Sequence, residues 1–258
     1  MIKFFRKIRQ NLLMENKTSK YFKYAIGEIV LVVIGILIAL QINNWNEKRK
    51  ASIEELNILK ALQSDFFTSK KRIEETIKIQ SRVMKNSEVL IEIHERQNKS
   101  EINYFDTHLD SLDYLISYGI SWYRAEPITG AYNSLISAGK IDLIQNQELR
   151  QVLAQFIADF ESGFEDQDSA MKLLDILNNE IDHFILKIAS NNFRERYNYS
   201  KRKIDTLNIS ASFFSNDKFF GNLYLKQVLE YNRINRQKEL LNQTNKILEL
   251  INQELNKR

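Results

Sequence analysis

The chain has 258 residues, of which 7 are glycine, 1 is proline and none is cysteine. Scarce turn residues argue against short strands and hairpins, and the lack of cysteine excludes disulfides, thiolate catalysis and cysteine-based metal sites. The formal net charge is +4. Residues 1–42 hold 7 basic and 2 acidic side chains, a net charge of +5, so residues 43–258 carry −1. The larger part therefore offers no basic surface that would attract nucleic acid, and we expect no such partner.

The first residues, MIKFFRKIRQNLL, fit an amphipathic helix with one apolar and one basic face. A basic helix with phenylalanine and leucine on its other face suits the plane of an anionic membrane surface. We expect residues 1–23 to form a cytoplasmic leader that contacts membrane lipid. The apolar face consists of Met1, Phe4, Phe5, Ile8 and Leu12.

Residues 25–42 read AIGEIVLVVIGILIALQI. From Ile29 to Leu40 every residue has an apolar side chain except for one glycine, Gly35. A membrane-spanning helix needs about 20 residues, which Phe22 to Trp45 supply. A buried helix of a soluble domain is disfavoured because the run is apolar on all sides. A cleaved signal peptide is disfavoured because no small-residue cleavage site follows the run. We predict an uncleaved transmembrane signal anchor over residues 24–45.

Basic residues decide the expected orientation of this span. Seven of them precede it and three follow closely, at positions 48–50. This asymmetry favours a cytoplasmic amino terminus, because basic segments are retained on the cytoplasmic side. Residues 46–258 would then lie outside the cytoplasm, which in a bacterium with two membranes means an inner-membrane protein with its bulk in the periplasm.

One face of the predicted span carries Glu28, Val32, Gly35 and Ala39. Gly35 and Ala39 form a small-xxx-small pair, which permits two helices to approach closely. We expect this face to be a possible interface in a homo-oligomer. A carboxylate in a span can mark a proton or ion pathway, but a single span cannot enclose one, so we favour an interfacial or dimer-stabilising role for Glu28.

The span also carries a family resemblance. YAIGEIVLVVIGILIALQINNWNE, with the basic leader before it, resembles an uncharacterised family of small membrane-anchored proteins from Bacteroidota, a domain of unknown function. The resemblance extends to GAYNSLISAGKIDLIQNQELRQVL at residues 130–153. It implies a membrane location and a helical carboxyl-terminal region, and it supplies no catalytic residues.

Apolar residues recur at helical spacing through most of the chain after the span. We predict helices over residues 45–97, 102–118, 129–138, 146–190 and 217–258, with Thr129 and Asn146 as amino-terminal caps and Gly139 as a carboxyl-terminal stop. The last helix is expected to bury Val228 and Leu229 among its apolar side chains. The predicted fold is all-α: a single transmembrane helix followed by an extracytoplasmic bundle of about four long helices, in part resembling a coiled coil.

Residues 120–130, ISWYRAEPITG, form the most irregular stretch and hold the only proline. Loops carry function more often than cores, so this stretch is the first candidate for contact with a ligand or partner. The alternative is that two aromatic side chains at positions 122 and 123 plug the end of the bundle. The candidate contact residues are Trp122, Tyr123, Arg124, Glu126 and, just beyond the stretch, Tyr132.

Known catalytic and phosphate-binding motifs are missing from the sequence. His108 lies among Asp106, Asp110 and Asp113, and Glu180 precedes His183 by three residues. The first group fits a solvated helix face, and the second is half of the paired Glu-x-x-His arrangement that di-iron bundles use. We therefore predict no metal, no cofactor and no catalytic residue.

The sequence favours a non-catalytic interaction or scaffold protein of the cell envelope, with an unidentified protein partner. The alternative is a periplasmic ligand-binding or sensory bundle. An enzyme ranks third, and a converging cluster of buried ionisable residues would raise it.

Overall fold

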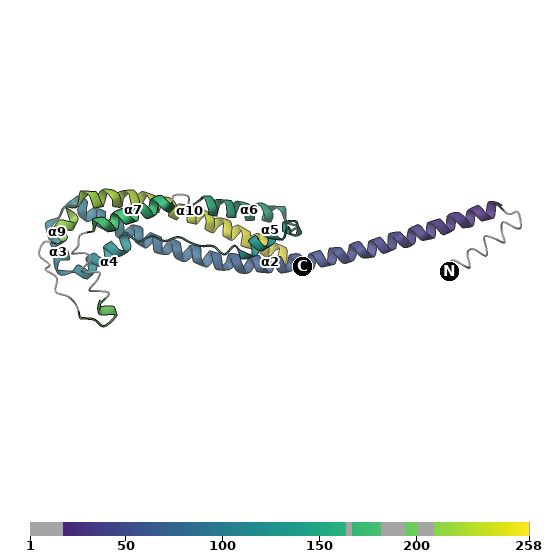
Figure 1. Ribbon diagram of the computed structural model, residues 1–258, viewed down its shortest axis with the longest axis horizontal. Coiled ribbons are helices and arrows are strands. Elements are labelled where there is room, and N and C mark those ends of the chain that lie inside the picture. Colours follow the sequence, from purple (N-terminus) through teal and green to yellow (C-terminus); the bar gives the residue numbers. More distant parts are fainter. Residues whose placement is uncertain (1–17, 164–166, 182–193, 201–208, 258) are drawn as a thin grey trace. The chain divides into compact units, whose positions relative to one another are not determined.

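The computed structural model describes residues 18–163, 167–181, 194–200 and 209–257 (Figure 1). The expected leader helix lies outside these residues, as does His183. Regular secondary structure within the described residues is entirely helical. The chain divides into two compact units, residues 1–57 and 58–258.

The first unit is helical from residue 18 onward. Helix α2, Thr18–Arg96, begins there, and its residues from 58 onward belong to the second unit. Its apolar window has a mean hydropathy of 2.6, and none of that window is buried within the protein. Large side chains such as Leu31 and Leu37 are 66 % and 58 % exposed. By length and composition the described residues thus contain one helix that could cross a membrane.

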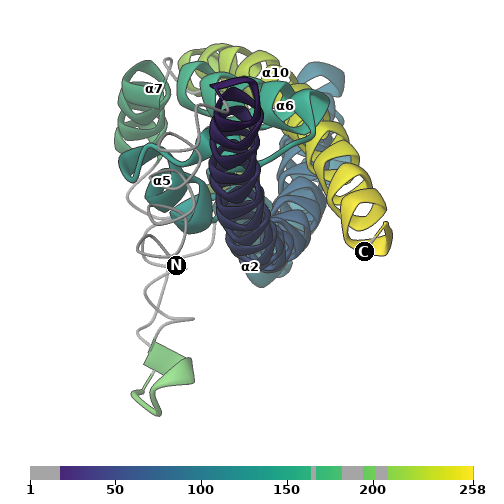
Figure 2. The ribbon, with the colours of Figure 1, turned by 90° about the vertical axis from the view of Figure 1, so that its right-hand side faces the viewer.

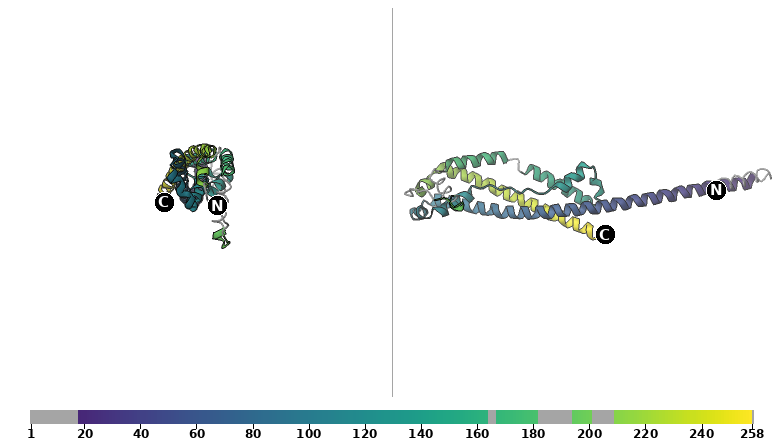
Figure 3. Two further views of the ribbon diagram at one scale, coloured as in Figure 1. Left: turned by 90° about the vertical axis from the view of Figure 1, so that its left-hand side faces the viewer. Right: turned by 60° about the horizontal axis from the view of Figure 1, so that its bottom comes forward.

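Two long helices organise the second unit, namely α2 from Ile58 onward and α10, Asp217–Asn256. They run antiparallel, as side-chain hydrogen bonds at three levels show. These bonds join Gln63 to Asn252, Gln80 to Gln237, and Glu95 to Tyr224. Figure 3 shows α10 beside this part of α2.

Two shorter helices, α6 (Gln147–Ser162) and α7 (Gln167–Glu180), follow one another along α10 (Figure 1). The sequence predicted one helix across this region, and the structure instead ends α6 at Gly163. A side chain at Gly163 would bring Cβ within 2.6 Å of the Asp159 carbonyl oxygen and 3.1 Å of the Arg236 side chain. The glycine thus permits α6 to end against α10, and in end view α7 lies to one side of the bundle (Figure 2).

Helices α3 (Lys99–Thr107), α4 (Leu109–Gly119) and α9 (Ile209–Phe214) pack at the far end of α2 and the start of α10. The sequence predicted one helix over residues 102–118, but His108 separates α3 from α4. Its Nδ1 lies 2.9 Å from the Tyr104 carbonyl oxygen and 3.0 Å from the Thr107 hydroxyl. A side chain that competes in this way for a main-chain carbonyl weakens the helical ladder.

Helix α5, Gly130–Ser137, follows the irregular stretch, and a 3₁₀ turn, Ile141–Leu143, leads into α6. Asn146 caps α6 as predicted, since its side chain accepts a hydrogen bond of 2.9 Å from the Leu149 amide. Thr129 makes no side-chain capping bond. Asp65 of α2 accepts the Ala131 amide instead, at 2.8 Å, so the start of α5 is fixed to a different helix.

Buried apolar side chains form two separate clusters within the second unit. One lies at the α3, α4 and α9 end, and the other lies where α5 and α6 pack on α2 and α10. Leu90, Leu112, Phe214 and Leu223 belong to the first cluster, and Leu59, Phe66, Phe156, Leu240 and Ile247 to the second. Between Leu223 and Leu240 the buried face of α10 is almost wholly polar.

Candidate functional site

The core positions of α10 recur at alternating intervals of four and three residues, the spacing that keeps one helical face inward. Four consecutive core positions are polar or charged rather than apolar. These are Lys226, Glu230, Arg233 and Gln237, and each is at most 2 % exposed. With Gln80 of α2 and Gln167 at the start of α7 they make up what we call the polar layer.

Most of these side chains bond to one another. The Lys226 Nζ lies 3.2 Å from the Glu230 Oε2, and the Arg233 Nη2 donates to the Gln167 Oε1 at 3.1 Å. Gln237 donates to the side-chain oxygen of Gln80. The polar layer therefore ties α10 to both α2 and α7.

The irregular stretch joins this layer through Trp122 and Tyr123. The Arg233 Cζ lies 4.0 Å from the centroid of the Trp122 ring, and the Lys226 Nζ lies 5.5 Å from it. Cations at these distances are attracted to the negative face of an indole. Gln80 donates to the Tyr123 carbonyl oxygen at 2.8 Å, which fixes the main chain beside the indole. Trp122 thus lies against the polar layer between the two clusters and does not plug the bundle end.

Burial perturbs both members of the central ion pair. Desolvation lowers the pKa of Lys226, and the carboxylate of Glu230 only partly opposes this. Desolvation likewise raises the pKa of Glu230, against the influence of the Lys226 ammonium group and of Arg233. Charged groups removed from water shift toward their neutral forms in this way.

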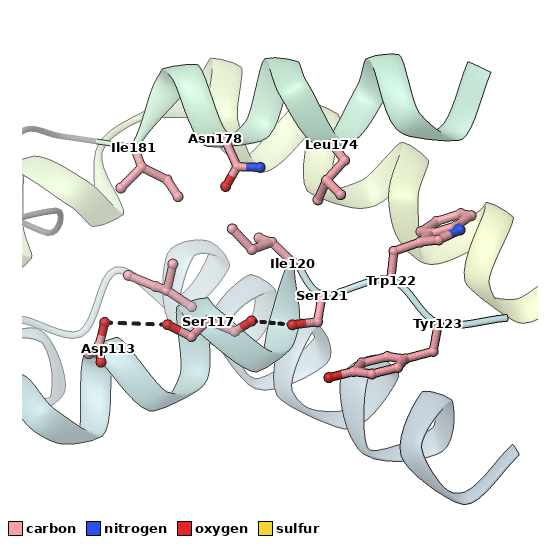
Figure 4. A pocket seen from close by; sticks show the side chains of 10 residues that line it. Asp113, Ser117, Ile120, Ser121, Trp122, Tyr123, Leu174, Asn178 and Ile181 are labelled. Carbon is pink, nitrogen blue, oxygen red and sulfur yellow. Dashed lines mark hydrogen bonds between the residues drawn. The ribbon is translucent and has the colours of Figure 1, made fainter. Parts of the chain in front are cut away.

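A groove of about 500 Å³ lies beside Trp122, between α4, α7 and the irregular stretch (Figure 4). Ile116, Ile120, Leu174 and Ile181 provide apolar walls. Asp113, Ser117, Ser121, Trp122, Tyr123 and Asn178 complete the lining. In Figure 4, Asp113 lies at one end and Trp122 at the other.

The five predicted contact residues do not converge on one site. Trp122 and Tyr123 line the groove, whereas Arg124 is exposed, with its guanidinium carbon 5.3 Å from the Phe160 ring. Glu126 accepts a 3.1 Å hydrogen bond from Arg72 through its main-chain oxygen. Tyr132 packs against the second apolar cluster.

The residues predicted as a span interface lie in the first unit. Val32 is 54 % exposed, Ala39 is exposed and Glu28 is half-buried. A Cβ on Gly35 would meet no atom within 4 Å, so the helix surface is open there.

The candidate metal residues have other contacts. The Asp106 carboxylate accepts the Ser210 amide at 3.0 Å, at the start of α9. Glu180 forms an ion pair of 2.7 Å with Lys218. Among the residues that the structure describes, no group of three or more histidine, aspartate or glutamate side chains is placed to hold a metal ion.

Sequence reasoning did not find the polar layer, although α10 carries a signal for it. The buried residues at 219, 223, 240, 244 and 247, all of them apolar except Thr244, recur at a regular helical phase. Positions 226, 230, 233 and 237 continue that phase. Val228, predicted to be buried, is out of phase and 60 % exposed.

The comparisons with known proteins identify a family but no function. Residues 28–162 match the model of a family of unknown function, DUF6090, so more than half of the chain is covered and the chain belongs to that family. No curated protein and no solved structure matches the chain. The matched region contains Gln80, Trp122 and Tyr123, whereas the charged residues of α10 lie beyond it.

Proposed function

We propose that the chain is an inner-membrane protein with a cytoplasmic amino terminus and a periplasmic helical domain, acting as a non-catalytic interaction or scaffold module of the envelope. The observation that carries the proposed membrane location is the apolar window of α2, none of which is buried within the protein. Exposed apolar surface of that extent is typical of membrane or protein interaction sites, and the length of the window suits a bilayer.

Reporter fusions at the carboxyl terminus test this topology. A reporter that works only in the periplasm should be active, and one that works only in the cytoplasm should be inactive. The reverse pattern would overturn the proposed orientation.

Self-association through the span is the first interaction that we propose. The open surface at Gly35, on one face with Glu28, Val32 and Ala39, supports close approach of a second copy. The test is crosslinking of the full chain in membranes, with Gly35→Leu compared with Gly27→Leu. Both glycines have open surroundings, but Gly27 lies off the proposed face. We expect only Gly35→Leu to reduce the dimer yield, and equal yields would count against the interface.

A ligand-binding or sensory role is the second candidate, and the groove beside Trp122 favours it. Small-molecule sites are concave, largely apolar and supplied with a few polar groups, which describes this groove.

The polar layer does raise the question of catalysis. However, its members are two cations, one carboxylate and three amides, arranged mainly in contact with one another. Affinity capture from solubilised membranes distinguishes the scaffold role from the sensory role. A specific protein partner would support the scaffold role, and a co-purifying small molecule would support the sensory role.

A further inference from the structure

We propose that the groove binds a small amphiphilic carboxylate, whose apolar body lies between α4 and α7 and whose carboxylate reaches Lys226 and Arg233 when the Trp122 indole turns aside. This inference rests on the second candidate function and is independent of the span and its proposed self-association.

The walls of the groove suit an apolar ligand body. Ile116, Ile120 and Ile181 are each at most 8 % exposed, and Leu174 packs against the same apolar cluster. The volume of about 500 Å³ falls within the range of about 300–1,000 Å³ that is common for small-molecule sites. The three isoleucines already expose little surface, so an alkyl chain would displace water mainly from the half-buried Leu174, Trp122 and Tyr123, which is favourable in proportion to the buried apolar area.

Trp122 stands between the groove and the buried cations. Its side chain lines the groove, and its ring contacts Arg233 and Lys226. The indole nitrogen is buried and donates no hydrogen bond to any of the described residues. Turning the indole therefore breaks no hydrogen bond of its own to them, and the contacts that it gives up include those with the two cations.

A carboxylate would replace those contacts with stronger ones. Charge-assisted hydrogen bonds to a guanidinium group are shorter and stronger than a cation–π contact, and a guanidinium can bind a carboxylate through two parallel bonds. The two ends of the groove also differ in charge. Asp113 lies at one end and Trp122, with the cations behind it, lies at the other (Figure 4). The two cations outnumber the Glu230 carboxylate beside Lys226, so this polarity orients an anionic head group toward Trp122 and opposes a cationic one there.

Tryptophan fluorescence of the full chain in phosphatidylcholine nanodiscs tests the proposal. The chain has two tryptophans, and Trp45 is 67 % exposed in the first unit, so Trp45→Phe leaves Trp122 as the only indole. Octanoate, 1-octanol and octyltrimethylammonium serve as probes below their micelle-forming concentrations. We expect octanoate to change the Trp122 emission saturably and at least about tenfold more tightly than 1-octanol, and the ammonium probe to have no saturable effect. Calorimetric titration of the unsubstituted chain should give the same order.

Two sets of variants locate the binding. Leu174→Gln places an amide in the groove wall, and Ile176→Gln is its control on an exposed position of the same helix. Only the first should weaken octanoate binding. The triple variant Lys226→Gln/Glu230→Gln/Arg233→Gln removes both cations without leaving a carboxylate unpaired, and it should remove the preference for octanoate over 1-octanol. Equal binding of the two probes to the unsubstituted chain, equal effects of the two groove variants, or a preference that survives the triple substitution would each overturn the proposal.

Discussion

The Lys226–Glu230 pair leads to a quantitative prediction about stability. Lys226→Met leaves the Glu230 carboxylate, which is 0 % exposed, without its ammonium partner. Removing one partner of a buried ion pair typically costs about 3–5 kcal/mol, because a charge remains buried. Glu230 can reduce this cost by taking up a proton. At pH 7 its ordinary pKa of 4.5 lies 2.5 pH units away, so protonation costs about 3.4 kcal/mol at about 1.36 kcal/mol per unit.

The sign of the pH dependence follows from the same reasoning. Burial raises the pKa of Glu230 in the folded protein, and loss of Lys226 raises it further. A carboxyl whose folded pKa exceeds its unfolded value contributes most to stability below the unfolded value, and that contribution is lost as pH rises to the folded one. The destabilisation caused by Lys226→Met should therefore shrink as the pH falls from 7 to 5, by at most about 2.7 kcal/mol for the uptake of one proton.

Denaturant unfolding of the full chain in detergent micelles, followed by far-UV circular dichroism at pH 7, 6 and 5, measures this change. Lys238→Met, an exposed position on the same helix, is the control and should alter the free energy of unfolding by less than about 0.5 kcal/mol. The double variant Lys226→Met/Glu230→Leu should be more stable than the single variant, because no carboxylate then remains buried without its ammonium partner. A penalty that does not vary with pH, or a double variant as unstable as the single one, would refute the reasoning.

Three further predictions concern helix ends. Gly163→Ala should destabilise the protein by about 1–3 kcal/mol, because its Cβ would collide with a main-chain oxygen one turn earlier. Gly221→Ala is the control: this position in α10 has open surroundings, so the substitution should stabilise the protein by about 0.5–1 kcal/mol. Thermal unfolding of both variants measures the two effects. Asn146→Ala should cost about 1 kcal/mol through loss of the α6 cap, with the exposed Asn242→Ala as a control in the same assay. Asp65→Ala should leave the start of α5 without its acceptor, which faster hydrogen exchange at the Ala131 amide would reveal and unchanged exchange would contradict.

Local signals in the sequence predicted much of the helical fold. Asn146 and Gly139 show why, since each acts within one turn of its own position. Asn146 caps α6 through an amide three residues away, and Gly139 adopts a φ of +65° at the end of α5. Thr129 was a plausible cap by the same rule, yet Asp65 takes that role from a distant part of the chain. A competing acceptor 66 residues away leaves no local trace in the sequence.

The candidate site was harder to predict because its residues gain their role only in the packed bundle. Gln80 looks like a polar interruption of α2, and the structure buries it completely against Tyr123 and Gln237. The aromatic residues of the irregular stretch were identified as candidates, but their neighbours Arg233 and Lys226 are more than 100 residues away in the chain. The helical phase of α10 predicts that Arg233 and Lys226 are buried, but it does not predict which residues they contact.

The polar layer also restricts how the long helices can align. Two antiparallel helices with apolar faces can slide past each other by seven residues and still bury those faces, so apolar contacts alone discriminate poorly between such registers. A slide of seven residues in one direction would carry Lys226 and Glu230 to the level of the first apolar cluster, and a slide in the other direction would carry Arg233 to the level of the second. The Lys226–Glu230 pair lies within α10 and would move with it, but Gln237 would lose Gln80 and would be buried without its partner. The bonds of the polar layer to α2 thus favour the observed alignment over others that hydrophobic packing would allow.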